Sequence, residues 1–263
     1  MRYLCFLFFV FACHEAQPER FDTDTDDAVM ETDSQNQNHT DETDDVDESI
    51  HNISPSEGTG GRWVPGEVGT TPLGASVRIP ATYRPEVLAS PVIWLFHEQL
   101  ENWEHVDEDG AIVVAINEYN DWDAIYAKLN ETLILLEEEY NVDRGRYYFA
   151  GWSAGGNIAV VVASMNQDII AGTMVFPGTG GSMAEPYMAQ KPAGNLRLFY
   201  ACGDEDPNFP WPQVEQESNY WAAKYGYTTR FEKVEGAGHY IDEERFGIRA
   251  EAWSWLKNFN LKN

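Results

Sequence analysis

From Trp63 onward, short apolar runs alternate with longer stretches in which apolar residues recur every three or four positions. Apolar runs that are bounded by loop-forming residues predict buried strands. We expect such strands at 76–79, 91–96, 111–116, 146–150, 169–176, 196–202 and 228–234.

The stretches between these runs predict helices. At 122–140 the apolar residues from Ile125 to Leu136 recur at helical spacing, and Asp121 is available as the N-terminal cap. Further helices are expected at 154–165, 213–225 and 243–259. Strands that alternate with helices predict an α/β domain with a mostly parallel sheet and helices on both faces. No long insertion separates the strands that end at 176 and begin at 196, so we expect no large lid.

The N-terminus indicates export. Residues 1–13 combine Arg2 with an apolar stretch that is too short to span a bilayer permanently. This stretch ends in V-F-A-C, which resembles a bacterial lipobox, so Cys13 is expected to be lipidated after cleavage. A plain secretory signal is the alternative. In both cases the mature protein is expected outside the cytoplasm, lipid-anchored to a bacterial membrane or cell surface, or secreted.

The composition of residues 14–61 predicts a disordered acidic linker. Between His14 and Glu57 there are 15 acidic residues and one arginine, which account for about half of the net charge of -27. Such a segment repels itself and has too few large apolar residues to fold alone. The remainder of the chain is also acidic and has no basic run, which argues against nucleic acid or an anionic membrane surface as a partner. Contact with a membrane is expected only through the lipid anchor.

Three loops that follow predicted strands carry candidate catalytic residues. Ser153 lies in a G-W-S-A-G run between a strand and a helix, where the two glycines permit a sharp turn that exposes the hydroxyl. The acidic loop 203–207 follows another strand, and His239 follows the last one. Loops beyond the carboxyl ends of parallel strands meet at one edge of the sheet, so a nucleophile, an acid and a base can converge there. Either Asp204 or Asp206 can supply the acid.

On these features, residues from about 75 to 259 resemble the α/β-hydrolase superfamily. The segment 142–156, V-D-R-G-R-Y-Y-F-A-G-W-S-A-G-G, is similar to secreted polyhydroxybutyrate-depolymerase-like and feruloyl-esterase-like members and, more loosely, to dienelactone hydrolases. The resemblance implies an α/β-hydrolase domain at 62–263. It also implies that Ser153 is the nucleophile, His239 the base and Asp206 the orienting acid.

The same resemblance implies an oxyanion hole. Its first donor is the backbone N–H of Ala154, at the amino end of a helix whose dipole favours negative charge. Family members usually have His-Gly after the preceding strand, whereas this chain has His97-Glu98-Gln99. The N–H of Gln99 is therefore the second expected donor. Glu98 in place of glycine implies a different loop path, a negative charge that affects substrate choice, or weaker catalysis.

These features predict a serine esterase that cleaves small or polymer-attached carboxylic esters through an acyl-enzyme, with no metal or cofactor. Candidate residues of an aromatic substrate rim are Trp152, Phe209, Trp211 and Tyr240, although core packing explains such residues equally well. A serine peptidase of the same fold and a surface-binding module without turnover are the alternatives. Cys202 is expected to be a buried core residue.

Overall fold

The computed structural model describes residues 54–192, 194 and 196–261. The chain divides into two units, Met1–Glu48 and Ser49–Asn263, and the described residues all belong to the second. The expected export signal, Cys13 and linker residues 14–53 therefore lie outside the described residues. Within the described part, no helix is both long and apolar enough to cross a membrane.

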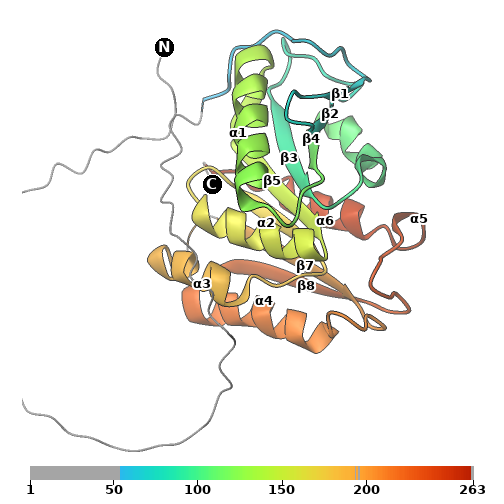
Figure 1. Cartoon of the computed structure of the whole chain (residues 1–263), viewed down its shortest axis with the longest axis vertical. Coiled ribbons are helices and arrows are strands. Elements are labelled where there is room, and N and C mark those ends of the chain that lie inside the picture. Colours follow the sequence, from blue (N-terminus) through green and yellow to red (C-terminus); the bar gives the residue numbers. More distant parts are fainter. Residues whose placement is uncertain (1–53, 193, 195, 262–263) are drawn as a thin grey trace, which may run out of the picture. The chain divides into compact units, whose positions relative to one another are not determined.

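An eight-stranded sheet in the order β1-β2-β4-β3-β5-β6-β7-β8 forms the centre of the fold (Figure 1). The strands from β3 to β8 are parallel, and the short strands β1 and β2 pair antiparallel at one edge. The mostly parallel sheet that the sequence predicts is thus confirmed. The strands are β1 (Val68–Thr70), β2 (Ser76–Arg78), β3 (Ser90–Phe96), β4 (Ile112–Ile116), β5 (Val142–Trp152), β6 (Gly172–Phe176), β7 (Arg197–Gly203) and β8 (Thr228–Val234).

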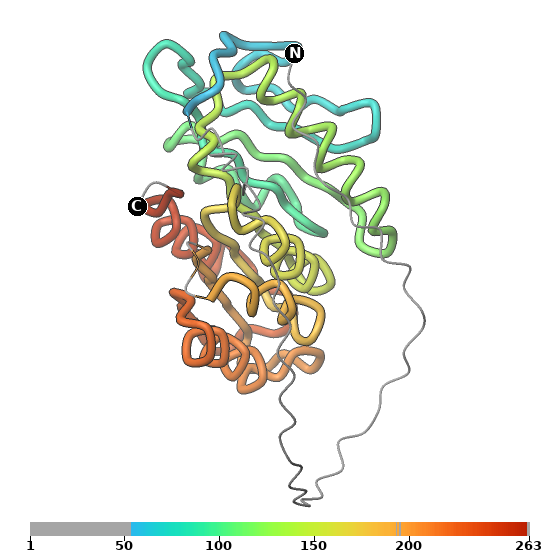
Figure 2. The backbone as a smooth tube through the Cα atoms, turned by 90° about the vertical axis from the view of Figure 1, so that its left-hand side faces the viewer, coloured from blue at the N-terminus to red at the C-terminus, as the bar shows by residue number. Residues whose placement is uncertain are grey.

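Helices cover both faces of this sheet (Figure 1). On one face pack α1 (Trp122–Glu139), α2 (Ala154–Met165), α3 (Gly181–Gln190) and α4 (Trp211–Tyr225). On the other face the 3₁₀ helix η1 (Leu100–Asp109) packs with α6 (Ile248–Leu256), which follows the short α5 (Glu243–Phe246). Right-handed crossovers explain this division. The connection from β3 to β4 crosses the sheet in one direction and the connections from β4 to β8 cross it in the other, so η1 lies on the opposite face from α1 to α4. Figure 2 shows the resulting order along the longest axis, with blue and green elements at one end, yellow in the middle and orange at the other.

The side chains of β3 alternate between the two helical layers. Trp94 lies on the α1 side, where its indole N–H donates to the Thr132 hydroxyl at 2.9 Å. Ile93 and Leu95 belong to the core beneath η1 and α6. Every residue of β3 is buried, as a central parallel strand between two layers requires. The carboxyl ends of β3 and its neighbours are therefore held in fixed relative positions.

Three elements have no counterpart among the predicted ones: β1, η1 and α3. β1 is too short to form an apolar run, and η1 and α3 each bury only two residues, so neither has a strong apolar stripe. The single helix expected at 243–259 is wrong. It is divided at Gly247, whose φ of 61° ends α5 and precedes α6, and α6 ends at Leu256.

Residues 54–62, the N-terminal strap, are docked on the domain (Figure 1). Ser56 is buried, its N–H donates to the Val142 carbonyl at 3.0 Å, and its hydroxyl accepts the Val142 N–H at 2.8 Å. Arg62 forms an ion pair with Glu139 at 2.6 Å. The prediction that residues 54–61 belong to an unstructured linker is therefore wrong, because they complete the backbone hydrogen bonds at the start of β5.

Candidate active site

Ser153 lies at the corner between β5 and α2, with a φ of 56°. A Cβ on Gly151 would lie 2.1 Å from the carbonyl oxygen of Gly155, and a Cβ on Gly155 would lie 1.8 Å from that of Phe96. Both positions therefore exclude any side chain. The sharp turn expected from the sequence is present, and it holds the serine in a strained conformation of the kind found at functional sites.

His239, in the loop after β8, bridges Ser153 and Asp206. Its Nε2 lies 2.9 Å from Ser153 Oγ, and its Nδ1 lies 2.9 Å from Asp206 Oδ2. The Trp152 indole N–H donates to the His239 carbonyl at 3.0 Å, and the Phe209 ring stacks on the imidazole at 5.8 Å between centroids. A neutral imidazole that donates from Nδ1 to the carboxylate presents the lone pair of Nε2 to the serine hydroxyl.

Asp206 is held rigidly in the loop after β7. Its side chain is fully buried, and Oδ1 accepts the backbone N–H groups of Asn208 and Phe209 at 2.8 and 3.0 Å. These two donors orient the carboxylate, so that Oδ2 is left to face His239. Both oxygens of the buried carboxylate therefore have hydrogen-bond partners.

Asp204 has a different place. Its Oδ1 accepts the backbone N–H of Gly236 at 2.7 Å, which ties the loop after β7 to the loop that carries His239. The pKa of Asp204 is lowered, first by a hydrogen bond with the Glu235 side chain and then by the Gly236 amide. Of the two acids that the sequence pattern offers, the structure therefore brings Asp206 to the imidazole.

Three of the four candidate rim residues lie close to the imidazole of His239. The Trp152 ring lies 5.1 Å from it and 6.0 Å from the Tyr240 ring, and the Phe209 ring stacks on it. The fourth candidate, Trp211, begins α4, and the Lys233 ammonium lies 4.9 Å from the centre of its ring.

A row of flat rings continues past Trp152. His97 lies 5.0 Å from Trp152, and Tyr119 lies 4.6 Å from His97. Tyr119 is 47% exposed, so the row extends from the imidazole to the surface. His97 was not among the expected site residues, and its φ of 52° makes it the second strained residue of the site. Successive rings of the row are tilted by 35° to 45° to one another.

The two expected oxyanion donors differ in availability. The N–H of Ala154 is in the first turn of α2, directly after the nucleophile. The N–H of Gln99 already donates to the Glu98 carboxylate at 2.9 Å. The loop that contains Gln99 does lie against the turn, because a Cβ on Gly155 would come within 2.8 Å of the His97 Cβ. The second donor is thus nearby but engaged.

The model of the dienelactone hydrolase family matches residues 78–257, which is more than half of the chain and includes Ser153, Asp206 and His239. The chain belongs to the dienelactone hydrolase family. This agrees with the resemblance to α/β-hydrolases found in the sequence, and it makes hydrolysis the general activity of the chain. None of the curated proteins compared matches this family member.

Solved structures share the fold of this dienelactone hydrolase family member. An S-formylglutathione hydrolase from Staphylococcus aureus is 14% identical, with a TM-score of 0.56, over 76% of this chain and 97% of that one. A feruloyl esterase module from Clostridium thermocellum, complexed with sinapinate, is 20% identical, with a TM-score of 0.50, over 69% and 83%. Dipeptidyl peptidase 4 from Porphyromonas gingivalis is 16% identical, with a TM-score of 0.55, over 75% of this chain. The chain spans only 36% of that peptidase's length.

Sequence reasoning missed the partner of Glu98 in this dienelactone hydrolase family member. Glu98 is buried, and its Oε2 accepts two N–H groups of Arg249, at 2.7 and 3.0 Å. The available signal was an arginine on the helix face that also carries Ala252 and Trp253, both buried. A charged residue on an apolar face requires a buried partner, but the sequence does not say which of the distant carboxylates it is.

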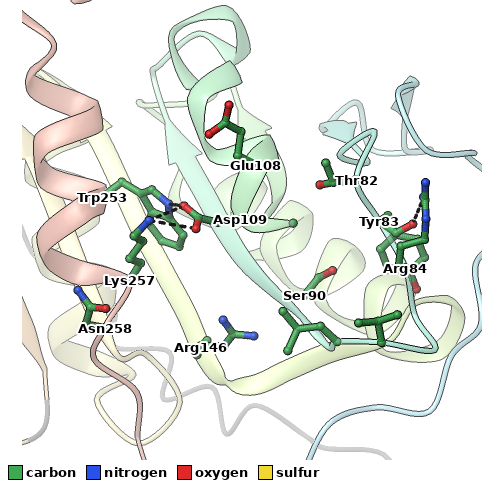
Figure 3. Close-up of a pocket in the computed structure, with 13 residues that line it drawn as sticks. Thr82, Tyr83, Arg84, Ser90, Glu108, Asp109, Arg146, Trp253, Lys257 and Asn258 are labelled. Atoms are coloured by element: carbon green, nitrogen blue, oxygen red, sulfur yellow. Dashed lines mark hydrogen bonds and ion pairs between the residues drawn. The ribbon is translucent and has the colours of Figure 1, made fainter.

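Two of the hollows in the described part of the chain lie at opposite edges of the sheet. One, of about 440 Å³, lies at the amino ends of the strands (Figure 3). Ser153 follows the carboxyl end of β5, at the opposite edge. Asp109 in the wall of this first hollow binds both Trp253 and Lys257, at 2.7 and 2.9 Å. The other, of about 590 Å³, adjoins Tyr240 and is lined by Glu101, Asn102, Glu104, His105, Tyr240, Asp242, Glu243 and Glu244. Within the described ranges, no group of three or more His, Cys, Asp or Glu side chains is arranged to hold a metal ion.

Proposed function

We propose that this chain is a serine carboxylic-ester hydrolase that works through an acyl-enzyme. The observation that carries the proposal is the line from Ser153 Oγ through His239 to Asp206, with both hydrogen-bond distances at 2.9 Å. Membership of the family supports hydrolysis. The side-chain line supports a serine nucleophile with an oriented base and needs no metal or cofactor.

In the proposed reaction, Ser153 Oγ attacks the ester carbonyl while His239 Nε2 takes the hydroxyl proton. Asp206 stabilises the imidazolium, and the N–H of Ala154 donates to the oxygen that becomes negative. The tetrahedral intermediate expels the alcohol, which receives its proton from Nε2. Water then loses a proton to the same nitrogen and attacks the acyl-serine. The acyl–Oγ bond breaks, Ser153 Oγ takes the proton from Nε2, and the carboxylic acid is released.

The surroundings of the serine support esters with a flat acyl group, either small or attached to a polymer. The ring row from His239 through Trp152 to Tyr119 offers flat ring faces for contact with such a group. Among the structures with this fold is a feruloyl esterase module complexed with sinapinate, which is consistent with such a substrate. The acidic hollow beside Tyr240 disfavours anionic substrates by charge repulsion.

One observation favours a second candidate, a binding module of the same fold without turnover. The N–H of Gln99 is occupied by Glu98, so in this conformation it does not face an open oxyanion hole. The loss of one oxyanion donor costs about 10²- to 10³-fold in rate. The occupied donor therefore favours the binding module, whereas the intact line from Ser153 through His239 to Asp206 opposes it.

A fluorophosphonate probe tests the proposal, because only an activated serine reacts rapidly with it. We expect the wild-type chain to be labelled at Ser153 and to release chromogenic short-chain and hydroxycinnamoyl esters. Ser153→Ala and His239→Ala should remain unlabelled. Release of peptide amides in preference to esters would favour a peptidase, and a wild-type chain that is neither labelled nor active would favour the binding module.

We further propose that Cys13 carries a lipid and tethers the enzyme outside the cytoplasm. The lipobox-like V-F-A-C run supports this. Metabolic labelling with a fatty-acid analogue should mark the wild-type chain expressed in a bacterium and spare Cys13→Ser. A wild-type chain that is exported without label would leave the plain secretory signal as the better explanation.

A further inference from the structure

The hollow at the amino edge of the sheet is separate from the hydrolytic site (Figure 3). Its volume of about 440 Å³ is within the range of small-molecule pockets. Side chains from distant parts of the chain line it, including Ser90 of β3, Arg146 of β5 and Trp253 of α6. The proposed hydrolysis uses none of these side chains.

An irregularity in the sheet brings Arg146 to this hollow. The register between β3 and β5 shifts between Ser90 and Val92, and residues 143–146 of β5 have no partner on β3. Bulges of this kind redirect side chains and are common beside functional sites. Here the bulge places Arg146 in the wall of the hollow.

Two contacts hold the Arg146 guanidinium in a fixed position. Nε donates to Oδ2 of Asp143 at 2.7 Å, and Nη2 donates to the Ala89 carbonyl at 2.6 Å. Among the described residues, Nη1 has no hydrogen-bond partner. A guanidinium that is already ordered loses little freedom when its remaining donors bind a ligand.

Ser90 supplies a second unused donor. The residue is only 3% exposed and lines the hollow, but within the described part of the chain its hydroxyl forms no hydrogen bond. Figure 3 shows Ser90 and Arg146 at one end of the hollow and Glu108 at the other. Because buried hydroxyl groups are generally hydrogen-bonded, the end with the two donors fits a ligand that carries acceptor atoms.

Arg84 adds positive charge to the wall. Its guanidinium donates to the Tyr83 carbonyl at 2.7 Å and pairs with no carboxylate of the described ranges. Lys257, by contrast, is neutralised by Asp109 at 2.9 Å. Three basic and two acidic residues line the hollow, although acidic residues outnumber basic ones by 44 to 17 in the whole chain. The lining therefore favours an anion.

The segment after Arg84 supplies apolar surface. Val87 and Leu88 are 77% and 56% exposed, and Val87 is the most exposed large apolar residue that the structure describes. Both residues line the hollow. Their surface favours contact with an apolar group, because that contact removes it from water. An anion with an apolar body would match both parts of the lining.

We propose that this hollow is a binding site for a small organic carboxylate with an apolar body. The carboxylate accepts hydrogen bonds from Nη1 of Arg146 and from the Ser90 hydroxyl, and Arg84 adds attraction at the wall. The apolar body lies against Val87 and Leu88. The site does not depend on the proposed hydrolysis, because it lies at the edge opposite the nucleophile.

Isothermal titration calorimetry on the whole protein tests the ligand class, with octanoate as the probe. Octanamide has the same apolar body without the charge, and acetate has the charge without the body. Octanoate should bind at least tenfold more tightly than either. Failure of octanoate to bind, or equal affinity for octanamide, would overturn the proposal.

Variants then test the location of the site. Arg146→Gln should weaken octanoate binding at least tenfold, and Ser90→Ala about two- to tenfold. Arg144→Gln is the matched control, because Arg144 is in the same bulge but pairs with Glu137 at 3.0 Å and does not line the hollow. It should leave the affinity unchanged. Equal affinities in Arg146→Gln and Arg144→Gln would place octanoate elsewhere and overturn the site.

Arg84→Gln keeps the test decisive if Arg146→Gln does not fold. Arg84 is exposed, and its replacement removes a single contact with a backbone carbonyl. We expect a wild-type urea midpoint and octanoate binding that is about threefold weaker. Wild-type affinity in both Arg84→Gln and Ser90→Ala would also overturn the site.

Discussion

The two edges of the sheet contain similar polar residues and use them differently. At the carboxyl edge, Ser153 and Asp206 both meet one imidazole, at 2.9 Å each. At the amino edge, Ser90 lines an open hollow, while Arg146 pairs with its near neighbour Asp143 at 2.7 Å. At the carboxyl edge, side chains from separate loops converge on His239. At the amino edge, Arg146 pairs with a carboxylate three residues away in the sequence.

Backbone strain separates the same two edges. In the described part of the chain, His97 and Ser153 are the only residues other than glycine with positive φ, and both are at the carboxyl edge. Such conformations cost of order 1–3 kcal/mol each and persist where the surroundings enforce them. Both edges contain polar and charged residues. The active-site edge differs because its side chains converge on one imidazole and two of its residues have a strained backbone.

Two serines at opposite edges give the largest expected contrast. Ser153→Ala should lower kcat for a chromogenic ester by about 10⁶-fold, because the nucleophile is lost. Ser90→Ala, at the amino edge, should leave kcat unchanged. Steady-state kinetics on both variants checks this, and ester turnover that survives in Ser153→Ala would contradict the proposed mechanism.

Two acids in one loop give the next contrast. Asp206→Asn should lower kcat by about 10⁴-fold, because the amide no longer holds the imidazole in the required tautomer. Asp204→Asn weakens the charge-assisted hydrogen bond from the Gly236 N–H but removes no partner of His239, so kcat should change only a few-fold. The reverse order of effects would move the orienting role to Asp204.

Gly155 and Gly110, at opposite edges of the sheet, allow the effect of an added methyl group on stability to be compared. Gly155→Ala should lower the free energy of unfolding by more than about 3 kcal/mol, since its Cβ would lie 1.8 Å from a backbone oxygen. At the amino edge, a Cβ on Gly110 would have no atom within 4 Å. Gly110→Ala should therefore lower the free energy of unfolding by only about 1 kcal/mol, the cost of an alanine at a φ of 70°. Urea unfolding of both variants measures the difference, and equal losses would argue against the tight packing of the turn.

The strap offers a smaller effect at the amino edge. Ser56→Ala should cost about 1–3 kcal/mol, because the buried Val142 N–H loses its side-chain acceptor. Arg62→Ala breaks a more exposed ion pair with Glu139 and should cost no more than about 1 kcal/mol. Neither should change kcat. Thermal melts rank the two, and a loss of activity in either would link the strap to the site.

Cys202 tests whether closeness to the site implies reactivity. Burial, followed by the charge of Asp206, raises the pKa of its thiol to about 12. At pH 8 the folded chain therefore holds the thiol protonated, and iodoacetamide should modify Cys202 slowly. In urea the pKa returns to about 8.5, and modification should become fast. The thiol's contribution to stability is complete below about pH 8.5 and is lost as the pH rises toward 12. Peptide mass spectrometry measures both rates.

Local signals in the sequence predicted much of the fold and part of the site. Gly151 and Gly155 mark the turn around Ser153 because each glycine is required by contacts within a few residues or with the adjacent strand. Strand ends followed from apolar runs, and the Asp121 cap is present, with Ala124 N–H donating to it at 3.0 Å. Helices and strands with strong apolar periodicity were therefore found.

Contacts between distant segments could not be predicted in this way. The partner of Glu98 lies 151 residues away, and no local pattern selects Arg249 from the other basic residues. The burial of Ser56 depends on the edge of β5, and the placement of Trp211 depends on the turn before α4. Each of these outcomes is decided by tertiary packing, which sequence periodicity does not contain.

The strap has a consequence for orientation. The chain joins the domain beside Val142, at the start of β5, whose 11 residues span roughly 35 Å and end next to the nucleophile. A partner fused directly before residue 54 would therefore join the domain at the amino edge of the sheet and leave the edge that carries the nucleophile unobstructed.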